Sequence, residues 1–269
     1  MSTANVSSLL KLENRAALVT GGGSGIGEGA ARWLAKAGAQ VALVGRDLAD
    51  LQKVEKLIVA DGGVAKTFEA DISDAETMQQ VTDEAAKVFG RLDVLFANAG
   101  VNGVWAPIEE LKYKEFEETI NNNLIGTFIT IKSAVPHLKR RGGSIIVTSS
   151  VNGSRIFSNT GATAYSTSKA GQVAMAKMLA VELAKWKVRV NVICPGAIDT
   201  HINENTEQRH TEKVKVPVNY PEGAIPLTGG KPGTKDQVGQ LVLFLASDAS
   251  NHISGTEIWI DGAESLVQG

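Results

Sequence analysis

A glycine-rich run, TGGGSGIG at residues 20–27, lies between a short apolar segment (AALVT, residues 16–20) and a segment with helical spacing. Glycine at 21, 25 and 27 permits a tight turn and lets the backbone come close to a pyrophosphate, whose charge would face the amino end of the helix. The spacing is GxxxGxG, which differs from the commoner GxGxxG fingerprint. A flexible turn is the alternative, but the strand before the run and the helix after it favour a dinucleotide site.

Apolar runs and helical segments alternate along the whole chain. Because helical segments separate the apolar runs, we expect a parallel sheet with helices on both faces. No composition break and no internal repeat marks a second domain, so we expect a single doubly wound α/β domain over residues 1–269. The seven expected strands are residues 16–20, 41–44, 64–69, 92–97, 144–148, 188–193 and 256–260.

The longest helical segment, at about 114–139, contains two irregular features. The polar triplet Asn121-Asn122-Asn123 interrupts it, and Pro136 is expected to kink or locally break it. Residues 200–228 are polar and irregular, and we expect them to form a loop that shapes the substrate site. The other expected helices are residues 26–37, 47–61, 74–88, 164–185 and 235–247.

Charge and composition exclude several classes of protein. The net charge is −2, so no basic field argues for nucleic acid. No stretch reaches the roughly 18 apolar residues of a membrane span, and the first dozen residues lack the features of a signal peptide. The single cysteine, Cys194, excludes an internal disulfide and fits a reducing compartment. We therefore expect a cytoplasmic protein without membrane or nucleic-acid partners.

The four histidines (137, 201, 210 and 252) show no metal-ligand spacing, and none neighbours the cysteine. We therefore expect no metal. His201 and His210 fall in the irregular segment, where we interpret them as solvated loop residues.

The run YSTSK places Tyr165 and Lys169 four residues apart, on one face of a helix. An ammonium group near a phenol favours the phenolate and is expected to lower the tyrosine pKa toward working pH. Such a phenol can give or take a proton at a carbonyl oxygen. The pair alone is a weak signal, but together with the glycine-rich run it indicates carbonyl chemistry beside a dinucleotide.

These motifs in this order resemble the short-chain dehydrogenase/reductase family, over about residues 12–262. The resemblance implies a Rossmann-type domain and an oxidoreductase that moves hydride between a nicotinamide cofactor and a ketone or secondary alcohol. It rests on TGGGSGIG at 20–27, NAG at 98–100, Asn123 before Leu124, SSVNG at 149–153, YSTSK at 165–169 and PGAIDT at 195–200.

The resemblance implies a catalytic tetrad of Asn123, Ser150, Tyr165 and Lys169. Tyr165 would be the general acid in reduction and the base in oxidation, and Ser150 would hydrogen-bond the substrate oxygen. Lys169 would lower the tyrosine pKa and bind the nicotinamide ribose. Asn123 would hold a water in a helix distortion that relays protons to bulk solvent. Ser149 competes for the serine role, although alternation at a strand end turns the two hydroxyls to opposite sides.

The resemblance also implies a set of cofactor-binding residues. Asn98 would approach the adenosine side, Asp71 and the Ile72 backbone the adenine ring, and the Ile198 backbone the carboxamide of the nicotinamide. A helix cap is the alternative role for Asp71. The full set is Gly21, Ser24, Gly25, Ile26, Gly27, Arg46, Asp71, Ile72, Asn98, Ala99, Gly100, Tyr165, Lys169, Pro195, Gly196, Ile198 and Thr200.

The end of the second expected strand favours NADP(H) over NAD(H). NAD-specific relatives carry an acidic residue at the position of Gly45, where it would repel a 2′-phosphate. Here Arg46 follows the glycine, and guanidinium suits phosphate by its charge and its fork of donors. Ser24 would add a hydroxyl. A solvated Arg46, or an ion pair between Arg46 and Asp47, is the alternative.

Substrate identity is less constrained. Val151, Ile156, Phe157 and Ala162 outnumber the one cation, Arg155, near the catalytic tyrosine, so we expect a fairly apolar ketone or alcohol rather than an acid.

Two other functions stay open. One is a 3-oxoacyl thioester reductase that docks an acidic carrier protein on Lys139-Arg140-Arg141. The other is a non-catalytic dinucleotide-sensing protein, which the presence of both Tyr165 and Lys169 disfavours.

A homotetramer with two-fold axes is also expected, since the helices at 114–139 and 164–185 pair across such an axis in relatives. These helices carry more apolar surface than one sheet face is expected to cover; in the alternative arrangement, all of it would face the protein's own sheet. The residues concerned include Ile129, Ala134, Val173, Met175 and Leu179.

Overall fold

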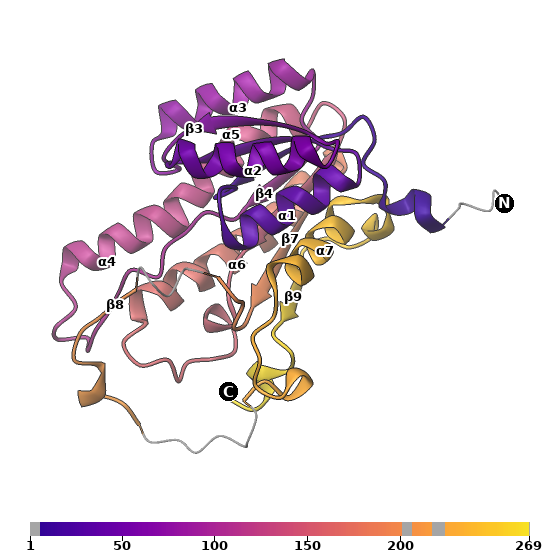
Figure 1. Ribbon diagram of the computed structural model, residues 1–269. Coiled ribbons are helices and arrows are strands. Elements are labelled where there is room, and N and C mark those ends of the chain that lie inside the picture. The colour runs from indigo at the N-terminus through magenta and orange to yellow at the C-terminus, as the bar shows by residue number, and fades with distance from the viewer. Residues whose placement is uncertain (1–5, 201–205, 217–223, 269) are drawn as a thin grey trace.

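Seven parallel strands form one sheet in the order β3-β2-β1-β4-β6-β7-β9 (Figure 1). The computed structural model describes residues 6–200, 206–216 and 224–268. All seven expected strands are present, so the predicted fold class is confirmed. Their bounds are β1 Ala16–Thr20, β2 Gln40–Gly45, β3 Val64–Glu69, β4 Val94–Ala97, β6 Gly143–Thr148, β7 Val188–Pro195 and β9 Glu257–Ile260.

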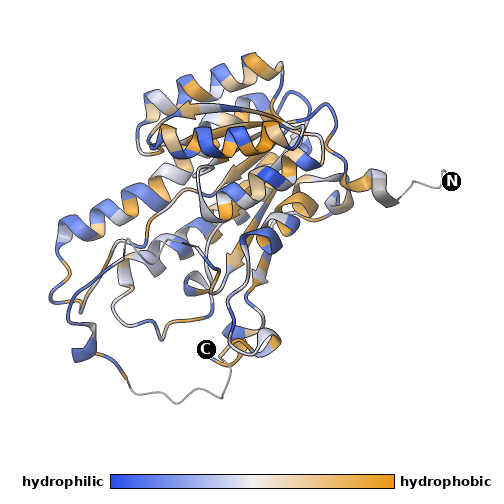
Figure 2. Ribbon diagram, in the orientation of Figure 1, coloured by the Kyte–Doolittle hydropathy of each residue, from blue (hydrophilic) through white to orange (hydrophobic). Residues whose placement is uncertain are grey.

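Helices cover both faces of the sheet, as the alternating pattern predicted. Helices α1 (Gly25–Lys36), α2 (Leu48–Ala60) and α7 (Lys235–Ala246) pack in one apolar cluster on one face. Helices α3 (Ala75–Phe89), α5 (Gly126–Leu138) and α6 (Thr163–Leu183) pack in a second cluster on the other. Figure 2 shows strands that are largely hydrophobic between helices of mixed hydropathy, as expected for a sheet buried on both faces.

The middle of the longest helical segment departs from regular helix. Helix α4 (Tyr113–Ile120) leads into a π-helical turn at Asn121–Ile125, and α5 follows at once. The asparagine triplet therefore marks a local widening of a continuous helix. Pro136 lies inside α5, which nevertheless continues to Leu138, so the expected break does not occur. A proline so close to the end of a helix costs only one backbone hydrogen bond.

Part of the predicted irregular loop forms a strand. β8 (Glu207–Gln208) pairs in parallel with β5 (Val104–Trp105), outside the main sheet. Arg209 then bonds the Glu115 carboxylate from Nη2 at 2.7 Å, and this hydrogen bond lowers the pKa of Glu115 to about 2. His210 contacts Glu110 at 2.5 Å, whereas His201 lies outside the described residues. These contacts fix residues 206–210 against α4 and β5.

The strand order reverses between β1 and β4, where both strands end in loops at the same edge of the sheet. Ligands of open α/β sheets bind in the crevice at such a point. The turn at residues 21–24 follows β1, and the NAG residues 98–100 follow β4. The tripeptide Lys139-Arg140-Arg141 precedes β6, at the opposite edge. It therefore does not face this crevice.

Within the described residues, no helix is long and apolar enough to cross a membrane. The same residues contain no group of three or more histidine, cysteine, aspartate or glutamate side chains that would hold a metal ion.

Candidate active site

The glycine-rich turn needs glycine for two separate reasons. Gly21 and Gly25 have φ angles of +66° and +51°, in the left-handed region that favours glycine. A Cβ at Gly27 would lie 2.0 Å from the Gly21 carbonyl oxygen, so the helix can pack against its own turn only without a side chain there. Ser24 precedes α1, and its side chain makes no capping hydrogen bond. The amide groups of the first helical turn are thus left for another acceptor.

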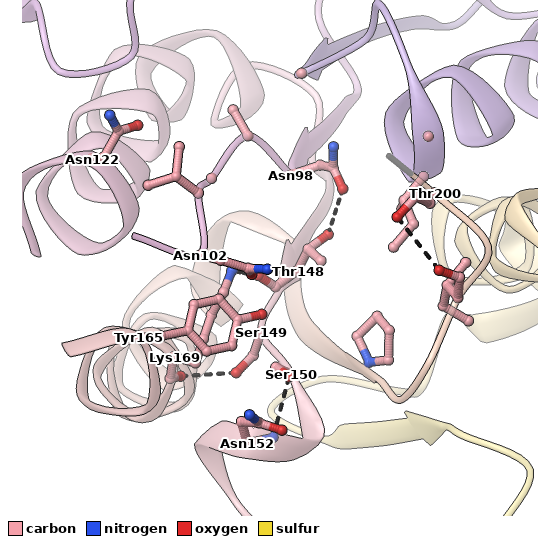
Figure 3. Close-up of a pocket in the computed structure, with 18 of the residues that line it drawn as sticks. Asn98, Asn102, Asn122, Thr148, Ser149, Ser150, Asn152, Tyr165, Lys169 and Thr200 are labelled. Carbon is pink, nitrogen blue, oxygen red and sulfur yellow. Dashed lines mark hydrogen bonds between the residues drawn. The ribbon is translucent and has the colours of Figure 1, made fainter. Parts of the chain in front are cut away.

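One cavity of about 820 Å³ runs from this turn to Tyr165. Most of the site residues predicted from the sequence line it, including Ser150, Tyr165 and Lys169 (Figure 3). Two do not. Gly27 is buried in the packing of α1, and Asn123 is buried behind the cavity wall. The predicted residues that line the cavity are Gly21, Ser24, Gly25, Ile26, Arg46, Asp71, Ile72, Asn98, Ala99, Gly100, Ser150, Tyr165, Lys169, Pro195, Gly196, Ile198 and Thr200.

Asn123 holds the wall of the cavity in place through both polar atoms of its side-chain amide. Its Oδ1 accepts from the Val101 amide at 2.8 Å, and its Nδ2 donates to the Val101 carbonyl at 2.8 Å and to Ser168 Oγ at 3.0 Å. The Asn123 backbone carbonyl accepts from Thr127 Oγ1 at 2.6 Å and from Gln172 Nε2 at 2.8 Å. Both lone pairs of this carbonyl are therefore used. Oδ1 accepts one hydrogen bond and has a second lone pair, so the role of Asn123 as a water ligand stays a prediction.

Gln172 is a residue that the sequence analysis did not single out. It lies on α6, is 1% exposed, and also donates to Thr127 Oγ1 at 2.8 Å. Gln172 thus ties α6 to the π-helical turn, while its Oε1 is buried without a hydrogen-bond partner. The available signal was a glutamine within the apolar run AGQVAMAKM, three residues after Lys169.

The two neighbouring serines at the end of β6 point in different directions. Ser149 Oγ donates to the Lys169 carbonyl at 2.8 Å, which commits it to the backbone of α6. Ser150 Oγ accepts from the Asn152 amide at 3.2 Å and lines the cavity near the Tyr165 hydroxyl, whose pKa it lowers. Only the Ser150 hydroxyl is therefore available to bind the same ligand as the phenol (Figure 3). This agrees with the prediction that alternation at the strand end turns the two serine hydroxyls to opposite sides.

The electrostatics of the Tyr165–Lys169 pair differ from the expectation. Burial raises the pKa of Tyr165 above its ordinary value, and the nearby Ser150 hydroxyl offsets only part of this effect. Burial also lowers the pKa of Lys169 to about 8. Lys169 Nζ lies 5.6 Å from the centre of the tyrosine ring and donates to the Thr148 carbonyl at 2.9 Å. The predicted lowering of the tyrosine pKa is wrong here because desolvation outweighs the effect of the Ser150 hydroxyl.

Arg46 lies at the opposite end of the cavity, and its partner is Asp71 rather than Asp47. Arg46 Nη1 is 3.8 Å from Asp71 Oδ2, with 65% of the arginine side chain exposed. Asp47 instead caps α2 by accepting from the Asp50 amide at 3.0 Å. Burial raises the pKa of Asp71, but hydrogen bonds from Ser73 and the Arg46 charge outweigh it and lower the pKa overall. Asp71 is therefore ionised and shares the cavity rim with the guanidinium.

A family model described as enoyl-(acyl carrier protein) reductase matches residues 21–263. The 3-oxoacyl-[acyl-carrier-protein] reductase FabG of Thermotoga maritima is 35% identical over 94% of this chain and 98% of its own length. The chain belongs to the short-chain dehydrogenase/reductase family.

Solved structures agree with this assignment to the short-chain dehydrogenase/reductases. The crystal structure of a 3-ketoacyl-ACP reductase from Sinorhizobium meliloti 1021 has a TM-score of 0.90 and 48% identity, covering 93% of this chain and 99% of that one. The NADPH-dependent 3-quinuclidinone reductase from Rhodotorula rubra has a TM-score of 0.85 and 28% identity, covering 99% of this chain and 97% of that one. The chain is thus an oxidoreductase of a family that binds nicotinamide dinucleotides.

The substrate end of the cavity is more polar than the sequence suggested. Of the four apolar residues proposed to shape it, Val151 and Ile156 line the cavity. Phe157 is instead 69% exposed, and Ala162 is buried away from the cavity. The residues that sequence reasoning missed at this end are Asn102, Trp105, Asn152, Asn159 and Glu264.

Proposed function

We propose that this short-chain dehydrogenase/reductase moves hydride between NADP(H) and a ketone or secondary alcohol, with Tyr165 as the general acid or base. The observation that carries the proposal is that Ser150, Tyr165 and Lys169 line one cavity together with the glycine-rich turn. The Ser150 hydroxyl lies near enough to the phenol to lower its pKa, and two neighbouring hydroxyls suit a substrate oxygen that gains or loses a proton.

The residues around the cavity fit a dinucleotide. The amide groups at the start of α1 and the free hydroxyl of Ser24 would receive the pyrophosphate or a ribose phosphate. Gly25 adopts a left-handed conformation there, and a Cβ on it would lie 3.2 Å from the Thr200 side chain. Glycine at this position therefore leaves the space between the turn and Thr200 free. When bound, the dinucleotide supplies or accepts the hydride at its nicotinamide ring.

The protein's own residues would handle the proton. In reduction, the Tyr165 hydroxyl donates its proton to the carbonyl oxygen, and Ser150 Oγ donates a hydrogen bond to the same oxygen. The Lys169 ammonium stabilises the phenolate that remains on Tyr165. In oxidation the phenolate takes the proton of the alcohol. Because burial raises the pKa of Tyr165, the protonated form dominates at neutral pH and favours reduction.

Preference for NADP(H) is supported by the residues at the end of β2. Gly45 and Arg46 both line the cavity, and the strand ends there without a carboxylate that would repel a 2′-phosphate. Arg46 is mostly exposed and its ion pair with Asp71 is long, so the guanidinium is available to a phosphate. The related 3-quinuclidinone reductase of Rhodotorula rubra is NADPH-dependent, which points in the same direction.

A 3-oxoacyl thioester reductase is the second candidate, favoured by the names of the Thermotoga maritima and Sinorhizobium meliloti relatives. The expected carrier-protein dock does not support it. Lys139-Arg140-Arg141 lies at the edge of the sheet opposite the cavity, and Lys139 Nζ stacks 3.6 Å from the centre of the Trp186 ring. Rates with free and carrier-bound ketoacyl substrates separate the two candidates.

Replacement of Tyr165 by phenylalanine tests the mechanism. We expect kcat for a ketone substrate to fall by at least about 100-fold, because general acid catalysis is worth that much. NADPH affinity, measured by calorimetry, should change little, since only the phenolic oxygen is removed. Tyr113→Phe is the matched control, because Tyr113 is 78% exposed on α4. A Tyr165→Phe enzyme that keeps more than about a tenth of the wild-type rate would contradict the proposal.

A further inference from the structure

The substrate end of the cavity carries a buried amide whose donor has no protein partner. Asn152 is 5% exposed and lines the cavity beside Ser150, whose Oγ accepts from the Asn152 backbone amide (Figure 3). Asn159 Nδ2 donates to Asn152 Oδ1 at 3.0 Å, which fixes the orientation of the amide. Within the described chain, Asn152 Nδ2 bonds no protein acceptor. The Nδ2 atom is not itself enclosed by protein, so it is open to the cavity and can donate to an acceptor on the substrate.

The cavity also carries a carboxylate that can accept a hydrogen bond from the substrate. Glu264 lines the same cavity, and its Oε2 accepts from the Ala197 amide at 3.0 Å. This position depends on Gly196, because a Cβ there would lie 2.5 Å from the carboxylate oxygen. Glu264 Oε1 has no partner among the described residues. The nearby cation, Arg155, stacks 3.6 Å from the centre of the Trp259 ring and does not line the cavity. Among the described residues, no cation therefore pairs with the Glu264 carboxylate.

A flat aromatic wall completes the substrate end. Trp105 lines the cavity, and its ring centre lies 6.4 Å from that of Tyr165, with the planes tilted by 39°. The Trp105 indole donates to the Asn102 carbonyl at 3.2 Å, so its only polar group is already bonded. What remains is an apolar face, on which the flat side of a ring can pack.

We infer that the substrate is an uncharged ring that carries a hydroxyl next to the reacting carbon, as in a cyclic polyol or its hydroxyketone. The inference rests on the proposed function and replaces the expectation of a largely apolar substrate. Since Asn152 adjoins Ser150, the hydroxyl that accepts from Asn152 Nδ2 is the one vicinal to the reacting oxygen. Hydroxyls can also donate to Glu264 Oε1, whereas a carboxylate substrate would meet the negative charge of Glu264.

A set of cyclohexane alcohols tests this inference in the oxidative direction. The reaction transfers the carbinol hydride to the nicotinamide and the hydroxyl proton to Tyr165, leaving a ketone. With either NADP⁺ or NAD⁺, we expect kcat/KM for a 1,2-cyclohexanediol, cis or trans, to exceed that for cyclohexanol by roughly tenfold, the worth of one or two hydrogen bonds. 2-Hydroxycyclohexanecarboxylate should be the poorest of the three.

Variants assign the preference to the two residues. Asn152→Leu keeps the shape of the side chain and should reduce the diol-to-cyclohexanol ratio to about one. Asn152→Asp provides a second variant in case the first does not fold, and should reduce the ratio as well, because it replaces the donor by an acceptor. Glu264→Gln should raise the relative rate of the carboxylate. Asn251→Leu, at an exposed asparagine that does not line the cavity, is the matched control.

Each outcome decides the inference. A diol preference that Asn152→Leu or Asn152→Asp removes supports it. Cyclohexanol as the best substrate, a preference for the carboxylate, or a diol preference unchanged in the Asn152 variants overturns it, while the proposed hydride transfer stands. If no alcohol is oxidised and no ketone is reduced with either dinucleotide, the proposed function and this inference both fail.

Discussion

Lys169 is buried and Tyr165 is half-buried, and desolvation acts on both in the direction of the neutral form. The phenol pKa is raised above its ordinary value, and the ammonium pKa is lowered to about 8. Across the neutral range the pair therefore consists of a protonated phenol and a charged lysine. This is the arrangement that a reductase needs, because the phenol must give a proton and the ammonium must stabilise the phenolate left behind.

The pH dependence of reduction should accordingly follow Lys169 rather than Tyr165. As pH rises through about 8, Lys169 loses its charge, while the phenol, whose pKa is raised, stays protonated. We expect kcat/KM for ketone reduction, which reports the groups of the free enzyme, to be constant below this pH and to fall above it. In Lys169→Arg the guanidinium stays charged, so whatever activity remains should not fall near pH 8. An unchanged profile in that variant would show that another group titrates.

Arg46 controls the choice of dinucleotide in the proposed function. A charge-assisted phosphate contact is worth roughly 1.5–3 kcal/mol, so kcat/KM with NADPH should exceed that with NADH by about ten- to a hundredfold. Arg46→Ala should remove most of this difference and leave the NADH rate nearly unchanged. Lys53→Ala is a suitable control, because Lys53 is an exposed cation that pairs with Asp50 on α2. A wild-type enzyme that prefers NADH would contradict the assignment.

At the scale of elements, the central strands β1, β4 and β6 were predictable because they are buried on both faces and read as apolar runs. β1, for example, is buried at all five positions and was placed at its observed bounds. β5 and β8 have two residues each, too few for any pattern. Glu264 contacts Ala197 across 67 positions in sequence, and only the path of the folded chain brings them together. Local patterns thus predicted most of the cofactor end of the cavity but not its substrate end.

The π-helical turn between α4 and α5 is held by groups from a different helix. In a regular α-helix the Asn123 carbonyl accepts from the amide of Thr127; here the side chains of Thr127 and Gln172 donate to this carbonyl. The turn positions Asn123, which in turn fixes both backbone groups of Val101 in the cavity wall. Gln172 therefore acts on the site through Asn123, without contact with the cavity.

Gln172→Leu should reduce activity more than stability. The loss of two hydrogen bonds is offset by removal of the unpartnered Oε1, so the free energy of unfolding should change by less than about 1–2 kcal/mol. Displacement of Asn123 and Val101 should lower kcat roughly tenfold. Chemical denaturation and steady-state kinetics measure the two effects, with exposed Gln52→Leu on α2 as the control. A large loss of stability with kcat unchanged would assign Gln172 a purely structural role.

For the whole molecule, the proposed tetramer needs different residues from those predicted. Ile129, Ala134 and Val173 are buried in the protein's own core, and Met175 and Leu179 pack against that core. The face of the same helices that points outward is apolar at other positions. Phe128 on α5 is 49% exposed, and Met178 and Val181 on α6 are 74% and 81% exposed.

A charge on this outward face should dissociate the assembly. Met178 and Val181 are three residues apart and lie on one side of α6, so Val181→Asp would place a carboxylate among apolar side chains that a partner covers. We expect light scattering of the wild type to give about four times the 28.4 kDa of one chain, and the variant to give a smaller mass. Val59→Asp, on α2 at the other sheet face and 55% exposed, should leave the mass unchanged. A wild-type protein that is monomeric at micromolar concentration would rule out the tetramer, and the apolar residues of α5 and α6 would then be exposed to solvent in the active enzyme.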